Sequence, residues 1–443
     1  MPKRLNDNED SGSESLSLDL RLSPNKRSKT ENTGDSEPTV VDSSSLSDAP
    51  DEESEEEDSV DPVRDEEFYF EDGSVVLLVD DILFKVHASI LKSQSDVLEK
   101  MLSMPLVGVE ADVNAGTEAE GNANEERKGT CDENPIVIPE MEPIHFRNFM
   151  KMIYYPPSAK FFLTICLTDK NKENAWQNFK FYSDVARLSH RFGVTDTEQW
   201  ARSQLKRLIR IRTKDISSQA EGDDPFSYFL NALWYAGAIS DFRLLSGVRN
   251  LIQQFCTEPD YLPNDDLVSL LRTPDLREKD PPLFGFLFTL LLSFGHEIWD
   301  TDLFTRTDRM AFFSAQCYLT PFPSLLTAFL ETPLFVRPTS AATFSKILAE
   351  NPAKKPCANK CHQAAFTAWE AEFDDSYYED VNSKEILTAI GILAVLPERR
   401  LRFFDQLRTN KCTQYCYWRV VDQLDRDINR LYTRLAEYYQ EIE

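Results

Sequence analysis

Strand-forming sequence is confined to two short parts of this 443-residue chain, and helical patterns fill most of the rest. Residues 75–79 read Val-Val-Leu-Leu-Val, and residues 82–86 read Ile-Leu-Phe-Lys-Val after a polar Asp80-Asp81 pair. Two β-rich runs joined by two turn-forming residues predict a hairpin. A third short apolar run at residues 136–138 predicts another strand. A small sheet followed by helix-rich sequence indicates an α+β fold.

Helical spacing of apolar residues predicts two groups of helices, one on each side of residue 220. The first group starts at Ser89 and continues with Ser95–Leu102, Pro143–Tyr155, Asn174–Phe192 and Asp196–Ile211. The second comprises Phe226–Ala238, Phe242–Phe255, Asn264–Leu271, Leu283–Phe294 and a final, longest element at Cys412–Glu443. The most apolar of them, Leu283–Phe294, is too short to cross a bilayer and indicates a buried helix, so no membrane partner is expected.

The negative charge of the chain is concentrated in two segments. The formal net charge is −27, and residues 1–67 carry 21 acidic and 7 basic side chains. Residues 107–134 carry 8 acidic and 2 basic side chains. Such segments bury too little apolar area to offset their ordering entropy, so we expect a disordered acidic tail at 1–65 and a disordered insertion at 107–134. An acidic balance also argues against direct nucleic-acid binding, which needs clustered cations.

The start of the chain and its cysteines indicate a reducing compartment. Residues 1–30 lack the apolar core of a secretory signal, and eight cysteines are scattered over the chain without a disulfide-type spacing. Lys26, Arg27 and Lys29 form a short basic cluster of the kind that directs nuclear import. We therefore expect the protein in the nucleus, the cytoplasm or both.

The segment that follows the tail carries the most specific motif. Residues 72–91 combine the predicted hairpin with a Phe-x-x-His-x-x-hydrophobic-Leu pattern made by Phe84, His87, Ile90 and Leu91. A Ser-x-x-hydrophobic helix, a strand, an aromatic helix containing Phe149 and Tyr155, and a closing helix pair follow in order. This arrangement closely resembles a BTB/POZ domain, covering residues 66–212. The acidic tail and the insertion resemble BTB proteins expanded in filamentous, basidiomycete fungi.

The resemblance implies a function in protein binding. BTB modules bind proteins, often as homodimers, and many recruit substrates to cullin-RING ubiquitin ligases. We therefore expect an adaptor whose helical domain at 223–443 selects a client. The alternative is a nuclear transcription or chromatin factor without its own DNA-binding domain. Ser74 and Ala88 replace the charged pair of many transcription-factor members. The hydrophobic-x-Glu tripeptide of cullin-binding members is not clearly present; Ile138-Pro139-Glu140 fits in letters but lies on the strand after the insertion.

Catalytic motifs are absent from the sequence, and the chain is not expected to be an enzyme. It contains neither a Gly-rich phosphate loop nor a Gly-x-Ser-x-Gly or His-Glu-x-x-His pattern, and it has only five histidines. His87 could act in catalysis only with a second titratable group, and the neighbouring sequence offers none. We expect His87 to fix the junction between strand and helix.

Two cysteine pairs form the one candidate metal site. Cys357 and Cys361 are four residues apart, as are Cys412 and Cys416, so each pair can lie on one helix face and together offer four thiolates to zinc. The alternative is that these cysteines pack as small apolar side chains. No cofactor is expected, and zinc remains the alternative.

The last predicted helix carries an apolar stripe. Apolar residues recur at alternating spacings of three and four, at Val421, Leu424, Ile428, Leu431, Leu435 and Tyr438. The stripe could pair with a partner helix. Packing onto the chain's own helical domain is the favoured interpretation, because amphipathic helices usually serve their own core.

Overall fold

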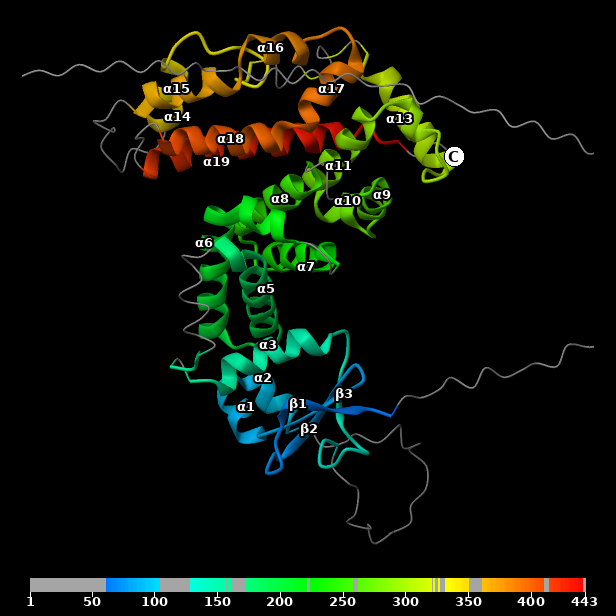
Figure 1. Cartoon of the computed structure of the whole chain (residues 1–443), viewed down its shortest axis with the longest axis vertical. Coiled ribbons are helices and arrows are strands. Elements are labelled where there is room, and N and C mark those ends of the chain that lie inside the picture. The colour runs from blue at the N-terminus through cyan, green and yellow to red at the C-terminus, as the bar shows by residue number, and fades with distance from the viewer. Residues whose placement is uncertain are drawn as a thin grey trace, which may run out of the picture. The chain divides into compact units, whose positions relative to one another are not determined.

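The computed structural model describes residues 61–103, 128–156, 158–160, 172–220, 224–257, 262–320, 322, 326, 331–349, 361–409 and 414–440. Within these ranges the chain forms one small sheet, drawn in blue in Figure 1, followed by many helices. The predicted α+β class is therefore confirmed.

The sheet contains four strands in the order β1-β3-β2-β4. β2 (Val75–Val79) and β3 (Ile82–Val86) form the predicted antiparallel hairpin, with Asp80 in the left-handed region at φ 54°. Aspartate tolerates this conformation better than most residues, which suits a two-residue turn. β4 (Ile136–Ile138) is the short strand that its apolar run predicted, and it pairs in parallel with β2.

The first strand was missed by the sequence prediction. β1 (Val63–Tyr69) pairs in parallel with β3, so the expected tail at 1–65 extends too far. The misleading feature is a run of acidic residues. One of these, Asp65, is only 4% exposed, accepts the backbone N–H groups of Glu67 and Phe68, and pairs with Arg147 Nε at 2.5 Å. These partners offset the cost of burying its charge.

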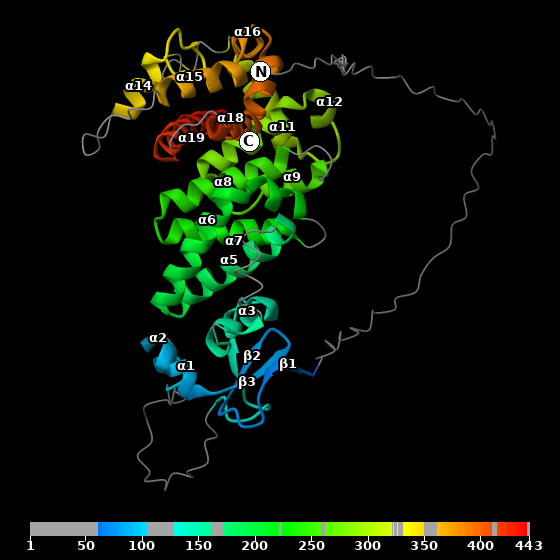
Figure 2. The same ribbon diagram turned by 60° about the vertical axis from the view of Figure 1, so that its left-hand side comes forward.

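Three helices and the end of a fourth cover the sheet. α1 (Ala88–Gln94), α2 (Asp96–Met101) and α3 (Pro143–Tyr154) lie where the helical spacing predicted them. Figure 2 shows α3 between the sheet and the next helices. The buried apolar residues of this region form one cluster, which we name the sheet core. It comprises Phe68, Val75, Leu77, Val79, Phe84, Val86, Leu91, Leu98, Ile138, Met141, Phe146, Phe149, Met150, Leu188, Phe192 and Val194.

The expected insertion ends earlier than residue 134. Residues 104–127 lie outside the described ranges, whereas residues 128–134 form turns bound to the sheet. Val76 N–H donates to the carbonyl of Gly129 at 2.8 Å, and Asp132 accepts from Arg64 Nε at 2.9 Å and from the Tyr69 hydroxyl at 2.6 Å. These long-range contacts order an acidic, Gly-containing stretch whose composition alone suggested disorder.

The expected boundary between residues 212 and 223 does not separate the two cores. α5 (Ala175–Arg191) places Leu188 and the residues after it in the sheet core, whereas Trp176 to Ala186 belong to a larger helical core. α6 (Thr195–Gln219) continues through a kink at Arg212 and also packs into that helical core. The resemblance assigned both helices to the first module, but their apolar faces bury against the helices that follow.

The helical core is built by the remaining helices. They are α7 (Pro225–Ala238), α8 (Phe242–Thr257), α9 (Asn264–Leu271), α10 (Leu276–Lys279), α11 (Pro281–Ser293), α12 (His296–Trp299), α13 (Arg306–Tyr318), α14 (Ala342–Ala349), α15 (Cys361–Glu372), α16 (Asp375–Val381), α17 (Ile386–Ala394), α18 (Leu396–Thr409) and α19 (Gln414–Ala436). The kink at Arg212 divides the 25 residues of α6, so α19, with 23 residues, is the longest unkinked helix in the described ranges.

The centre of the helical core is the contact between α11 and α19, which run side by side in Figure 1. Every residue of α11 from Leu283 to Leu292 is buried, as its strongly apolar sequence predicted. A Cβ atom on Gly285 would lie 1.9 Å from the carbonyl oxygen of Tyr432, so the two backbones touch at this glycine. The apolar stripe of α19 is buried in the same core, which confirms internal packing.

Two buried carboxylates stabilise the ends of helices in this core. Asp280 caps α11 by accepting Leu283 N–H and forms a two-bond pair with Arg249, at 2.8 and 2.7 Å. Asp308 closes a capping box with Thr305 at the start of α13 and accepts the Tyr439 hydroxyl at 2.8 Å. Burial opposes ionisation of Asp308, but these bonds and one from an arginine keep its pKa below the ordinary value.

Candidate protein-interaction module

His87 lies at the junction between β3 and α1 and binds two other elements. Its backbone N–H donates to the Tyr154 hydroxyl of α3 at 2.8 Å, and its ring Nδ1 lies 3.3 Å from the same oxygen. Ring Nε2 lies 3.3 Å from Asp72 Oδ2. Phe70 stacks against Tyr154 at 5.2 Å and against the imidazole at 5.3 Å between ring centroids. The junction is therefore fixed by hydrogen bonds and ring packing, as expected.

One tautomer of neutral His87 satisfies all of these contacts. With the proton on Nε2, the ring donates to Asp72 and accepts the hydroxyl proton of Tyr154 at Nδ1. The hydrogen bond from His87 is the main reason that the pKa of Asp72 lies below its ordinary value. Burial raises the pKa of Tyr154, which keeps the hydroxyl proton in place.

These titratable neighbours could not be found from the sequence around His87. Asp72 lies 15 positions before His87 and Tyr154 lies 67 positions after it, so only the fold brings them together. The tyrosine that contacts His87 is Tyr154, the last residue of α3, and the motif residue Tyr155 follows it. The Asp72 carboxylate is 84% exposed and Tyr154 serves as a backbone acceptor, so the group functions as a structural junction.

Tyr155 has a different role at the edge of the sheet. Its hydroxyl donates to a carboxylate oxygen of Glu67 on β1, and that bond raises the pKa of Tyr155 to about 12. Lys151 approaches the other Glu67 oxygen at 3.4 Å. Together these contacts tie the end of α3 to the first strand.

The remaining motif residues divide between the core and the surface. Phe84, Leu91 and Phe149 are at most 1% exposed in the sheet core, whereas Ile90 is half-buried and lies outside it. The Ser74 hydroxyl accepts Ala88 N–H at 2.9 Å and thereby caps α1. The two positions that are charged in many transcription-factor relatives of the resembled family thus form a neutral cap here.

A buried histidine–aspartate pair, which sequence reasoning missed, joins α3 to α5. His145 Nδ1 lies 2.7 Å from Asp184 Oδ1, although the contact is not aligned as a hydrogen bond. Asn148 Nδ2 donates to the other Asp184 oxygen at 2.8 Å. The side chains of the pair are 3% and 2% exposed. Because solvent does not reach them, they hold the two helices together and cannot meet a substrate.

The outer strands expose apolar side chains. β1 and β4 are the edges of the sheet, and Val63 and Val137 on them are 55% and 59% exposed. Ile144, in the first turn of α3, is 42% exposed. Exposed strand edges offer unpaired backbone groups to another chain. Both edges, β1 and β4, therefore have the exposed apolar side chains that a protein partner could cover.

The candidate cullin tripeptide lies in the turn after β4. Ile138 is buried at 4% exposure, while Glu140 is exposed and adopts the left-handed region at φ 54°. Arg191 Nη2 donates to the carbonyl of Pro139 at 3.0 Å and ties the turn to α5. The glutamate is thus presented to solvent on an anchored turn.

The structure brings together one cysteine from each predicted pair. Cys361 of α15 and Cys416 of α19 are 1% and 5% exposed and share one small cluster with Leu348, Ala364 and Tyr417. Cys357 and Cys412 lie outside the described ranges. Among the described residues, no group of three His, Cys, Asp or Glu side chains is arranged to hold a metal ion.

Lys26, Arg27 and Lys29 also lie outside the described ranges. None of the helices that the structure describes has the length and apolar character needed to cross a membrane. Comparisons with protein-family models, curated proteins and solved structures found no match to this chain.

Proposed function

We propose that this chain is a protein-interaction adaptor. Its BTB-like module binds a scaffold, for which a cullin of a ubiquitin ligase is the leading candidate, or a second copy of the chain. Its helical domain binds a client. The proposal rests on the residues of this chain alone, because the comparisons contribute no relative.

The observation that carries the proposal is the order of the elements around the sheet core. A hairpin, two short helices, a strand, an aromatic helix and a closing helix pair follow each other as in the resembled family. Phe84, Leu91 and Phe149 of the motif meet in one core, and His87 locks the junction. The exposed valines on both sheet edges supply a surface for a partner.

Affinity purification of the tagged full-length protein from its host, followed by mass spectrometry, tests this function. The disrupting variant is Leu91→Asp, which places a charge in the sheet core at a position 1% exposed. The matched control is Ser89→Asp on the same helix, where the side chain is exposed. We expect a cullin to be recovered with the wild type and the control and to be lost with Leu91→Asp.

The opposite result has an equally definite meaning. If no cullin is recovered and nuclear transcription or chromatin proteins are recovered instead, the adaptor proposal is wrong. The function would then be that of a nuclear BTB factor without its own DNA-binding domain. Loss of a cullin from the Ser89→Asp control would show that the assay reports surface charge rather than the module.

A further inference from the structure

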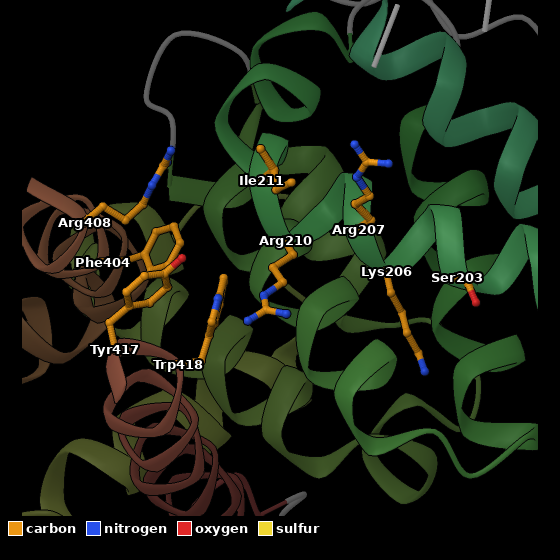
Figure 3. Close-up of a pocket in the computed structure, with 9 residues that line it drawn as sticks. All are labelled: Ser203, Lys206, Arg207, Arg210, Ile211, Phe404, Arg408, Tyr417 and Trp418. Atoms are coloured by element: carbon orange, nitrogen blue, oxygen red, sulfur yellow. The ribbon is translucent and has the colours of Figure 1, made fainter. Parts of the chain in front are cut away.

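A cavity of about 480 Å³ opens where α6 meets α18 and α19. Figure 3 shows Arg210 of α6 extending toward Trp418, with Phe404 and Tyr417 of α18 and α19 beside that ring, while Lys206 and Arg207 lie farther along α6. Four of the nine lining residues are basic, and among the described lining residues none is acidic. In a chain with a formal net charge of −27, such a concentration of cations is unusual.

Arg210 is the centre of this cavity. Its guanidinium carbon lies 3.5 Å from the centroid of the Trp418 ring, so the two planes are in contact. Stacking covers one face of the guanidinium and leaves its N–H edge free for a planar or tetrahedral anion. Within the described part of the chain no carboxylate accepts a hydrogen bond from Arg210, in contrast to Arg249 and Arg400.

The charges around Arg210 do not fully compensate the burial of its guanidinium group. Desolvation lowers its pKa, and the attraction of Tyr417 and Asp422 does not offset that effect. Arg243 lies close enough to lower the pKa further. An anion bound beside Arg210 would supply the compensation that the protein itself lacks.

Trp418 contributes a second unsatisfied donor. Its Nε1 atom is buried and has no hydrogen-bond partner within the described residues. Other buried atoms of the described residues, Trp176 Nε1 among them, also have no partner, so this donor adds to the geometry at Arg210 and does not by itself indicate a ligand. Phe404 and Tyr417 extend the aromatic wall beside it, with ring centroids 4.7 and 5.3 Å from the Trp418 ring.

Lys206 and Arg408, two other cations of the lining, differ in how strongly they are paired with carboxylates. Lys206 forms an ion pair with Asp241 and is already compensated. Arg408 is 3.8 Å from Asp405, and both side chains are at least half exposed, so that pair contributes little. Arg408 is therefore available to close on an anion held by Arg210.

We propose that this cavity binds a phosphorylated side chain within a peptide segment of a client protein. A phosphate offers several acceptors to the edge of Arg210, to Arg408 and to the Trp418 N–H, and the aromatic wall accommodates the flanking residues. A long polyanion such as nucleic acid would need cations along its whole length, whereas the cations here form one compact cluster. The inference rests on the proposed function, because it identifies the chemistry by which an adaptor recognises its client.

Fluorescence anisotropy with the purified full-length protein tests the proposal. The probes are fluorescein-labelled degenerate peptides with phosphoserine, phosphothreonine or phosphotyrosine fixed at the centre, each compared with its unphosphorylated form. We expect at least one phosphorylated pool to bind and Arg210→Gln to weaken it about tenfold or more, since a charge-assisted hydrogen bond contributes about 1.5–3 kcal/mol. Arg408→Gln should weaken binding less than Arg210→Gln. Trp418→Phe keeps an aromatic ring but removes the N–H group, so any loss of affinity in this variant reports the contribution of that donor.

Arg243→Gln is the matched control, because it removes a charge near Arg210 but does not line the cavity. We expect it to leave affinity within about twofold of wild type, since an exposed charge that makes no contact with the bound phosphate is largely screened by solvent and salt. Thermal unfolding checks that each variant is folded. Equal binding of the unphosphorylated pools, tighter binding of ATP or of single-stranded DNA, or equal losses in the Arg210 and Arg243 variants would overturn the proposal.

This outcome is separable from that of the adaptor proposal. If no phosphopeptide pool binds while a cullin still copurifies in a Leu91-dependent manner, only the cavity inference fails. If phosphopeptides bind but no cullin is recovered, the cavity inference stands and the scaffold must be another protein.

Discussion

Replacing Gly285 with alanine tests the closest contact in the helical core. The added Cβ would lie 1.9 Å from the Tyr432 carbonyl oxygen and 2.6 Å from its carbon, whereas real Cβ atoms essentially never approach below 3.0 Å. α11 and α19 must therefore move about 1 Å apart at this point. A gap of that size forfeits roughly a quarter to a half of each affected dispersion contact.

The cost follows from what obstructs the methyl group. Overpacking a core costs about 1–3 kcal/mol and occasionally more. Here the obstacle is backbone, which cannot rotate away, so we expect Gly285→Ala to reach about 3 kcal/mol despite the higher helix propensity of alanine. At about 2 °C per kcal/mol for a large domain, the midpoint of thermal unfolding should fall by about 6 °C. Circular dichroism at 222 nm reports this transition because helices dominate the signal.

Gly391→Ala is the matched control. Gly391 lies within α17, and no atom would lie within 4 Å of its added Cβ. There alanine should stabilise the protein by about 0.5–1 kcal/mol, because it restricts the unfolded chain and favours the helix. Opposite signs for the two variants are therefore expected. A Gly285→Ala midpoint equal to or above that of wild type would refute the close approach of α11 and α19.

Three further expectations follow from single polar contacts. Tyr154→Phe should lower the free energy of unfolding by about 1–2 kcal/mol in urea denaturation, because the His87 N–H loses its acceptor. Arg249→Met should cost about 3–5 kcal/mol by the same measurement, because Asp280 remains buried without its partner, and adding Asp280→Asn should recover part of the loss. The pKa of Asp308 is lower in the folded than in the unfolded state, so its contribution is present above the unfolded value near 4 and is lost as pH falls through the folded value. Acid titration of Asp308→Asn should therefore show a shallower loss of stability below that pH.

Local sequence predicted those elements whose stability is set locally or by their own apolar pattern. The β2–β3 hairpin was readable because β-branched runs flank an Asp-Asp pair, and α11 because its sequence is apolar on every side. The stripe of α19 was readable because its 3–4 spacing survives over the whole helix. The favoured interpretation, that this stripe packs into the chain's own core, is also confirmed.

The missed features depend on partners far away in the sequence. β1 was missed because Asp65 looks like part of an acidic tail until Arg147, 82 residues later, neutralises it. Residues 128–134 were missed for the same reason, since Asp132 binds Arg64 across 68 residues. The His87 neighbours and the His145–Asp184 pair are also products of folding. Short-range periodicity contains no information about such pairs.

α5 contributes residues to both the sheet core and the helical core, so it connects the two parts of the proposed adaptor. Its first three turns pack into the helical core, and its last turn, with Phe192 after it, closes the sheet core. The His145–Asp184 pair fastens α3 to the middle of the same helix. The sequence prediction placed a boundary between two domains at residues 212–223, beyond both α5 and most of α6. A continuous helix and one buried polar pair instead connect the sheet core to the helical core, and α6, which follows α5 directly, carries Arg210 of the proposed binding cavity.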